Sequence, residues 1–128
     1  GESKTLEFKE TLSKNNHTGQ RDKNMEKTSL KTISAFMNSE GGVLLIGISD
    51  SGKIEGIEND FLKSKDDYLK HFHNLLKDNV GEQFYPLIDY KIKEITGKLI
   101  LFVSCKKSSS PVYLGNDEEF YVGNCHTS

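Results

Sequence analysis

The stretch "NSEGGVLLIGISDSGK", residues 38–53, decides the fold. Residues 43–48 at its centre are all apolar apart from Gly47. An apolar run of this kind predicts a central strand whose two faces are both covered by other elements. Paired glycines precede this strand and suit the end of a helix, because glycine adopts the left-handed conformation at little steric cost. Residues 50–52, Asp-Ser-Gly, predict a turn after the strand. Asp50 is therefore either a turn residue or one member of an acidic site.

Two helices are predicted on either side of this stretch. Apolar side chains recur at helical spacing over about residues 25–38 and again over about residues 66–80. Asp66 and Asp67 favour the start of the second helix, and Gly81 ends it.

The remaining segments read as strands and loops. "TLEFK", residues 5–9, alternates and predicts a short half-buried strand with Glu7 and Lys9 on its polar face. Residues 13–24 predict a mobile loop. Further strands are predicted at 53–57, in a hairpin over 88–104, and at 120–122. The sum is an α/β domain with a mixed β-sheet and two principal helices.

Composition limits the class of protein. The chain has 128 residues, 34% hydrophobic and 28% charged, with a net charge of −2, which suits one soluble globular domain over residues 1–128. No run reaches the ~18 apolar residues of a membrane span, and the polar N-terminus does not fit a signal peptide. Cys105 and Cys125 have no metal-ligand spacing and favour a reducing cytoplasm. Because the chain starts without methionine and stops without a capping element, we expect a domain excised from a longer protein.

Three acidic residues are candidates for a metal site: Glu2, Glu7 and Asp50. Carboxylates hold Mg²⁺ or Mn²⁺, and the crevice beyond the carboxyl ends of strands is where open α/β sheets bind ligands. Glu2 and Glu7 are an odd number of residues apart, so their convergence requires a bend before the strand. Lys9 is a candidate phosphate contact. Solvated surface acids, and a lysine paired with Glu7, are the alternative interpretation.

Other catalytic patterns are missing from the sequence. His71 and His73 are two residues apart on a helix, so they diverge and are expected to face solvent. The sequence has no glycine-x4-glycine-lysine phosphate loop. Ser49 lies in no glycine-x-serine-x-glycine nucleophile pattern.

Three segments resemble one known family. "ESKTLEFKETL" at 2–12, "ISAFMNSEGGVLLIGISDSGKIEGI" at 33–57 and "EEFYVGNCHTS" at 118–128 are similar to the Schlafen AlbA-type domain, also called the divergent AAA domain. The resemblance implies a nucleic-acid-associated α/β domain. In Schlafen-type nucleases that cut transfer RNA and ribosomal RNA, three acids form a metal site, and they match Glu2, Glu7 and Asp50.

Two departures from the family pattern accompany the resemblance. Family members more often carry a second acid at the position of Ser49. The closing motif commonly has an arginine where Gly123 stands and a glycine where Cys125 stands. An arginine there would be a bidentate phosphate contact, so its absence puts binding through that edge in doubt.

We therefore expect a nucleic-acid-binding domain of a microbial regulator or Schlafen-like protein that cleaves RNA with Mg²⁺ or Mn²⁺. Glu2, Glu7, Asp50 and Lys9 would be catalytic, and the phosphate contacts would come from Lys9, Lys14, Arg21, Lys106 and Lys107. A non-catalytic DNA-binding module of a transcriptional regulator remains an alternative, as does an ATP-associated or protein-interaction domain. The sequence leaves a homo-oligomer open.

Overall fold

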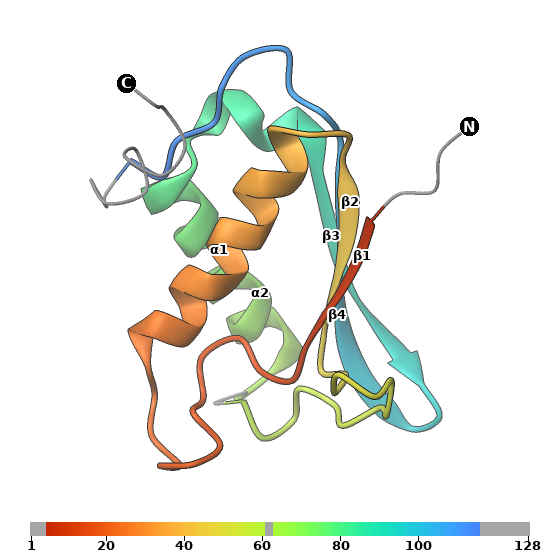
Figure 1. Ribbon diagram of the computed structural model, residues 1–128. Coiled ribbons are helices and arrows are strands. Elements are labelled where there is room, and N and C mark those ends of the chain that lie inside the picture. The colour runs from red at the N-terminus through yellow and green to blue at the C-terminus, as the bar shows by residue number, and fades with distance from the viewer. Residues whose placement is uncertain (1–4, 61–62, 116–128) are drawn as a thin grey trace.

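The computed structural model describes residues 5–60 and 63–115, which form a four-stranded mixed sheet with the helices packed against it (Figure 1). The strands are β1 (Thr5–Lys9), β2 (Gly42–Ile46), β3 (Ile88–Ile95) and β4 (Lys98–Cys105). Their order in the sheet is β1-β2-β4-β3. β1 runs parallel to β2, whereas β4 is antiparallel to both β2 and β3. The predicted α/β class with a mixed sheet is confirmed.

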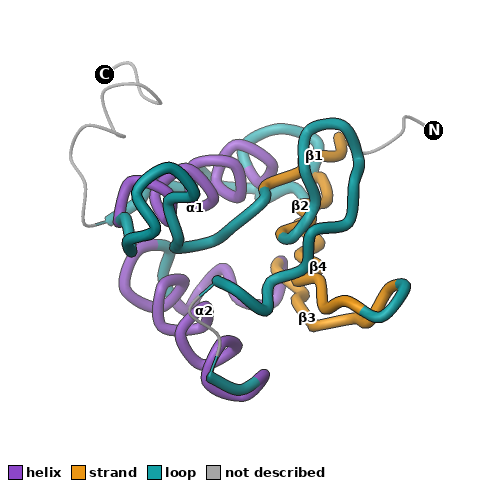
Figure 2. The backbone as a smooth tube through the Cα atoms, turned by 90° about the horizontal axis from the view of Figure 1, so that it is seen from below, coloured by secondary structure: helices purple, strands orange, loops and turns teal. Residues whose placement is uncertain are grey.

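Two helices lie on the same side of this sheet, α1 (Lys23–Met37) and α2 (Lys65–Asn79) (Figure 2). The side chain of Asp22 caps α1 by accepting from the amide of Asn24 at 2.8 Å. Ser64 caps α2 by accepting from the amide of Asp67 at 3.1 Å. Because an aspartate at the N-cap satisfies an otherwise unpaired amide, α1 begins two residues earlier than its apolar periodicity predicts.

The core lies between the helices and the sheet. Ile33 and Met37 of α1, Phe72 of α2, and Leu44 and Ile46 of β2 are all completely buried there. Burial of each such side chain contributes about 1.5–3 kcal/mol. The central strand and the two helices are therefore stabilised mainly by one another.

The paired glycines after α1 are required by two close approaches. Gly41 has φ of +88°, and its amide donates to the carbonyl of Phe36 at 2.8 Å, as predicted for a helix end. A Cβ on Gly41 would lie 2.7 Å from the carbonyl oxygen of Cys105. A Cβ on Gly42 would lie 2.5 Å from the ring of Phe36.

The other side of the sheet has no helix over it in the described part of the chain, and we call it the open sheet face. Leu6 is 54% exposed there, and Val43 and Leu45 are partly exposed. The prediction that β2 is covered on both faces is therefore wrong. Strand pairing assigns twelve residues to this face: Leu6, Phe8, Val43, Leu45, Asp89, Lys91, Lys93, Ile95, Lys98, Ile100, Phe102 and Ser104.

The same pairing corrects the orientation of β1. Its side chains alternate as predicted, but Leu6 and Phe8 point to the open sheet face. Glu7 pairs with Leu44 and Lys9 with Ile46, so both lie on the side that the helices cover. They remain accessible because β1 is the edge strand of the sheet.

Other predictions differ in detail. The hairpin is present as β3 and β4, but the strand predicted at 53–57 is reduced to one isolated bridge between Ile48 and Ile54. A short 3₁₀ helix, Glu82–Leu87, was not predicted. The strand predicted at 120–122 lies outside the described residues.

Within the described ranges, neither helix has the length and apolar character needed to cross a membrane.

Candidate functional site

The carboxyl ends of β1 and β2 bring three of the predicted site residues to one end of the sheet. The carbonyl of Lys9 accepts from the amides of Gly47 at 2.7 Å and Ile48 at 3.2 Å. The end of β1 therefore lies against the segment that leads to Asp50, which occupies the predicted turn. Glu7 lies two residues before Lys9 on the same strand.

The carboxylates of Glu7 and Asp50 are exposed and make no hydrogen bond or ion pair with any other described residue. Two oxygen donors of this kind suit a hard divalent cation. Glu2, the predicted third ligand, lies outside the described residues. Within residues 5–60 and 63–115, no group of three histidine, cysteine or acidic side chains is arranged to hold a metal ion. The described part of the chain therefore supplies two of the three expected ligands.

The predicted phosphate contacts fall into two groups at opposite ends of the sheet. Lys9, Lys14 and Arg21 lie at the end that carries Asp50, because residues 10–22 follow β1 directly. Lys106 and Lys107 follow β4, which is antiparallel to β2, and so lie at the other end. Lys107 also forms an exposed ion pair with Glu40 at 3.3 Å. The five residues do not form one continuous basic surface.

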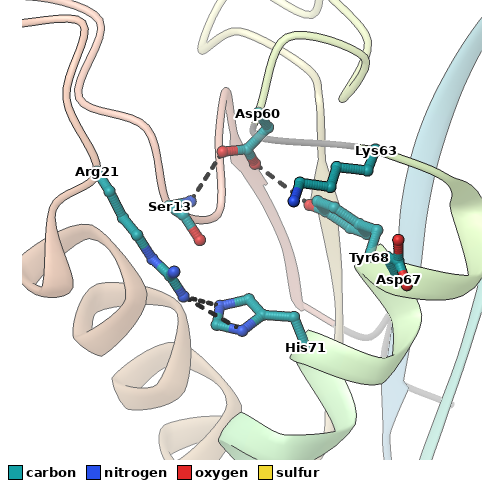
Figure 3. A pocket seen from close by; sticks show the side chains of 7 residues that line it. All are labelled: Ser13, Arg21, Asp60, Lys63, Asp67, Tyr68 and His71. Atoms are coloured by element: carbon teal, nitrogen blue, oxygen red, sulfur yellow. Dashed lines mark hydrogen bonds between the residues drawn. The ribbon is translucent and has the colours of Figure 1, made fainter.

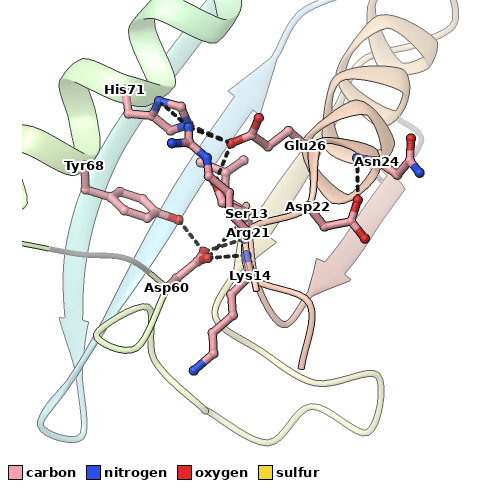
Figure 4. Close-up of polar contacts among 10 residues, drawn as sticks. Ser13, Lys14, Arg21, Asp22, Asn24, Glu26, Asp60, Tyr68 and His71 are labelled. Carbon is pink, nitrogen blue, oxygen red and sulfur yellow. Dashed lines mark hydrogen bonds and ion pairs between the residues drawn. The ribbon is translucent and has the colours of Figure 1, made fainter. Parts of the chain in front are cut away.

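A buried carboxylate that the sequence did not single out, Asp60, joins several loops near Asp50's end of the sheet (Figure 4). It accepts from the amides of Leu12, Ser13 (3.0 Å) and Lys14 (2.8 Å), and from the hydroxyl of Tyr68 at 3.3 Å. Burial raises the pKa of Asp60, and these donors oppose that effect. Burial raises the pKa of Tyr68 well above its usual value, so its hydroxyl keeps the proton that it donates.

A second buried carboxylate, Glu26 of α1, gathers three donors beside Asp60. The hydroxyl of Ser13 donates to it at 2.6 Å, Nε2 of His71 lies at 2.7 Å, and Arg21 lies at 3.3 Å. Burial raises the pKa of Glu26, but the hydrogen bonds from Ser13 and His71 and the nearby positive charges outweigh it, so the net pKa is lowered. A guanidinium nitrogen of Arg21 also lies against the His71 ring, 2.7 Å from Nε2 and 3.2 Å from Nδ1.

An open pocket of about 340 Å³ lies over this network (Figure 3). Ser13, Asp60, Tyr68, Arg21 and His71 line it, together with Lys63 and Asp67. The two buried carboxylates beside it already have hydrogen-bond partners. The network therefore has the properties of a structural clamp between the helices and the loop 10–22, and its acids are not available as metal ligands.

The histidines also differ from expectation. His71 and His73 diverge on α2 as predicted, but both are half-buried and bonded. Nδ1 of His73 lies 2.8 Å from the hydroxyl of Tyr90. The prediction that they face solvent is wrong, because each meets a polar partner from another element.

Comparison with known proteins places the chain in context. The family model "Schlafen, AlbA_2" matches residues 2–126. None of the curated proteins matches the chain.

Solved structures share the fold at low sequence identity. One is the DIP2311 protein from Corynebacterium diphtheriae, with a TM-score of 0.59 and 19% identity, covering 85% of this chain and 19% of that one. Another is the solution structure of the N-terminal domain of a "Putative ATP-dependent DNA Helicase RecG-related Protein" from Nitrosomonas europaea. Its TM-score is 0.59 at 20% identity, covering 88% of this chain and 71% of that one. The chain therefore corresponds to about a fifth of the length of the first of these proteins.

Proposed function

The chain belongs to the Schlafen AlbA_2 family, and from this premise we propose that it is a nucleic-acid-binding domain that cleaves RNA with a divalent metal ion. The observation that carries the proposal is the pair of exposed carboxylates of Glu7, in the middle of β1, and Asp50, in the turn that follows the parallel neighbour β2. The similar N-terminal domain, whose protein is named "Putative ATP-dependent DNA Helicase RecG-related Protein", supports the broader association with nucleic acid.

The contrast with the buried acids supports a functional role for this pair. Asp60 and Glu26 are each surrounded by donors, as buried carboxylates must be. Glu7 and Asp50 stabilise nothing that the described residues show, so their oxygens are free to meet a ligand. Glu2, Glu7 and Asp50 would hold Mg²⁺ or Mn²⁺, and such an ion would stabilise the negative charge that develops when a phosphodiester is attacked.

Lys9 lies close enough to Glu7 along β1 to contact a phosphate group of the same bound nucleic acid. It ends β1 two residues after Glu7, and no other described residue pairs with its ammonium. Lys14 and Lys53 flank the same end of the sheet and would add backbone contacts with the nucleic acid. Binding through such contacts should fall steeply with salt, because each contact releases a counterion.

The test is cleavage of transfer RNA by the protein with Mn²⁺, compared with the variants Glu7→Gln and Asp50→Asn. We expect each variant to lose more than about 100-fold of the cleavage rate, because even outer partners of a metal site are worth ~10–100-fold. Glu94→Gln is the matched control, since Glu94 is an exposed acid near the end of β3. Equal cleavage by the wild type and both variants would remove the enzymatic part of the proposal.

A second candidate function is a binding module without catalysis, and Ser49 favours it. Where the family more often has a second acid, the hydroxyl of Ser49 lies 3.0 Å from that of Ser51 and accepts from the amide of Lys53 at 3.1 Å. The position thus serves the turn. Salt-sensitive RNA or DNA binding without any metal-dependent cleavage would support this candidate.

A further inference from the structure

We propose that the open sheet face binds single-stranded RNA by stacking bases on Phe8 and Phe102, with lysines of β3 contacting the phosphates. This inference rests on the proposed function and adds a surface separate from Glu7 and Asp50. On the edge strand β1, Glu7 and Phe8 lie on different sides of the sheet, since side chains alternate.

Strand register places the relevant side chains in one row across the sheet. Phe8 of β1 pairs with Leu45 of β2, Leu45 pairs with Phe102 of β4, and Phe102 pairs with Lys91 of β3. Adjacent strands lie ~4.8 Å apart, so the two phenylalanines are separated by about 10 Å across Leu45. That spacing lets each ring receive a different base of one extended strand.

The row is accessible from solvent. Leu6, next to it on β1, is the most exposed large apolar side chain among the described residues at 54%. Phe8, Leu45 and Phe102 are each partly exposed. The ammonium of Lys93 lies over the Phe102 ring, 4.5 Å from its centre, in a cation–π contact.

The charges beside the rings favour a polyanion. Lys91 and Lys93 project from β3 on the open sheet face, against one acid, Asp89. The amide of Lys106 donates to the carbonyl of Leu87 at 2.9 Å and continues the ladder by one pair, so alternation directs the Lys106 side chain to this face as well. The partly apolar, aromatic surface therefore carries four lysines (Lys91, Lys93, Lys98 and Lys106) against one acid, although the net charge of the protein is −2.

Single-stranded nucleic acid fits this combination best. Only unpaired bases offer their flat faces to side chains, and every base can stack, so recognition of this kind is tolerant of sequence. The lysines would follow the backbone while the rings hold the bases. A second copy of this chain would instead bring Lys91, Lys93 and Lys106 of both protomers to one interface, where like charges repel.

The test uses the protein, a fluorescently labelled 12-nucleotide single-stranded RNA, and fluorescence anisotropy in EDTA so that cleavage does not interfere. The variants are Phe8→Leu, Phe102→Leu and the double variant, which keep apolar side chains at these partly buried positions. Tyr113→Leu is the control, because Tyr113 is an aromatic residue that is 36% exposed outside the sheet. Unchanged melting temperatures would show that the variants remain folded.

We expect each leucine variant to bind about tenfold more weakly and the double variant about 100-fold more weakly, as for the loss of stacked bases elsewhere. The control should bind like the wild type, and a duplex of the same sequence should be insensitive to the leucine substitutions. Lys91→Gln should reduce the slope of log affinity against log salt by about one.

The binding experiment distinguishes failure of this inference from failure of the proposed function. If the wild type binds RNA and the double variant binds equally well, the inference is overturned while the proposed function stands. If the wild type binds no RNA or DNA, both are overturned. If the wild type is a dimer that the double variant dissociates, the open sheet face is an interface between copies, and the inference is again overturned. Loss of cleavage without loss of binding in Glu7→Gln would separate the acidic site from this surface.

Discussion

Four acidic side chains at one end of the molecule divide into two pairs with opposite surroundings. Asp60 and Glu26 are almost fully buried, and each accepts hydrogen bonds from several donors. Glu7 and Asp50 are exposed and are bonded to no other described residue. The comparison teaches that polar contacts, and not residue type, distinguish an acid that holds the fold from an acid that is available for a ligand.

The largest expected effect is on the buried pair, from Asp60→Ala. This change leaves the amides of Leu12, Ser13 and Lys14 without their acceptor. Since a buried unsatisfied donor costs about 1–3 kcal/mol, we expect the free energy of unfolding to fall by about 4 kcal/mol. Urea unfolding measures this fall, and Asp50→Ala is the matched control, expected within about 0.5 kcal/mol of the wild type. Equal losses of unfolding free energy in the two variants would contradict the distinction between buried and exposed acids.

Glu26→Gln should be next in size. The amide keeps one acceptor oxygen but removes the charge that attracts Arg21 and His71, so we expect a loss of about 1.5–2 kcal/mol in unfolding free energy. Glu7→Gln is the control and should change it by less than about 0.5 kcal/mol. A larger effect from Glu7 would mean that its carboxylate has a structural partner.

The pH dependence should separate the two buried acids from each other. The folded pKa of Glu26 is lowered from its ordinary value of 4.5, so its contribution to stability is present above that pH and is lost as the pH falls through the folded pKa. The folded pKa of Asp60 is raised from 3.8, so its contribution has the opposite sign and is lost as the pH rises through the folded pKa.

Urea unfolding at pH 7, 5 and 3 measures these contributions. The stability difference between wild type and Glu26→Gln should shrink on acidification, whereas that between wild type and Asp60→Asn should grow. Parallel pH profiles for both variants would contradict the assigned signs.

The smallest expected effect is at the exposed ion pair of Lys107 and Glu40. Both side chains are more than half exposed, at 60% and 80%, and exposed pairs contribute about 0–1 kcal/mol. Lys107→Gln should therefore change the unfolding free energy by less than about 0.5 kcal/mol. A measurable loss of RNA affinity in the same variant would show that Lys107 serves a ligand.

The sequence predicted those features that depend on local pattern. Helical periodicity located both helices, and glycine at positions 41 and 81 marked their ends, because these requirements involve residues close in the chain. The turn at Asp50 was equally local. The fold class followed from the order of these elements.

Features set by distant partners could not be read from the sequence. Asp60 meets amides 46 to 48 residues away, and His71 meets Glu26 at a separation of 45 residues. The only local signal for Asp60 was an acid in a polar segment, which does not distinguish a clamp from a surface residue. Likewise, Val43 and Leu45 looked fully covered, because an apolar run does not reveal whether a layer packs on each side of the sheet.

The anchoring of residues 12–14 by Asp60 also affects how much conformational entropy the protein loses when it binds a ligand. A polar, glycine-containing loop would ordinarily lose about 1–2 kcal/mol per residue in backbone freedom on being immobilised by a ligand. Here the loop 10–22 is already fixed by Asp60, by the bridge between Lys14 and Arg21, and by the Asp22 amide that donates to Ser13 at 2.7 Å. A phosphate chain that meets Lys14 would therefore encounter a preorganised partner, and little of the binding free energy would be spent on ordering the protein.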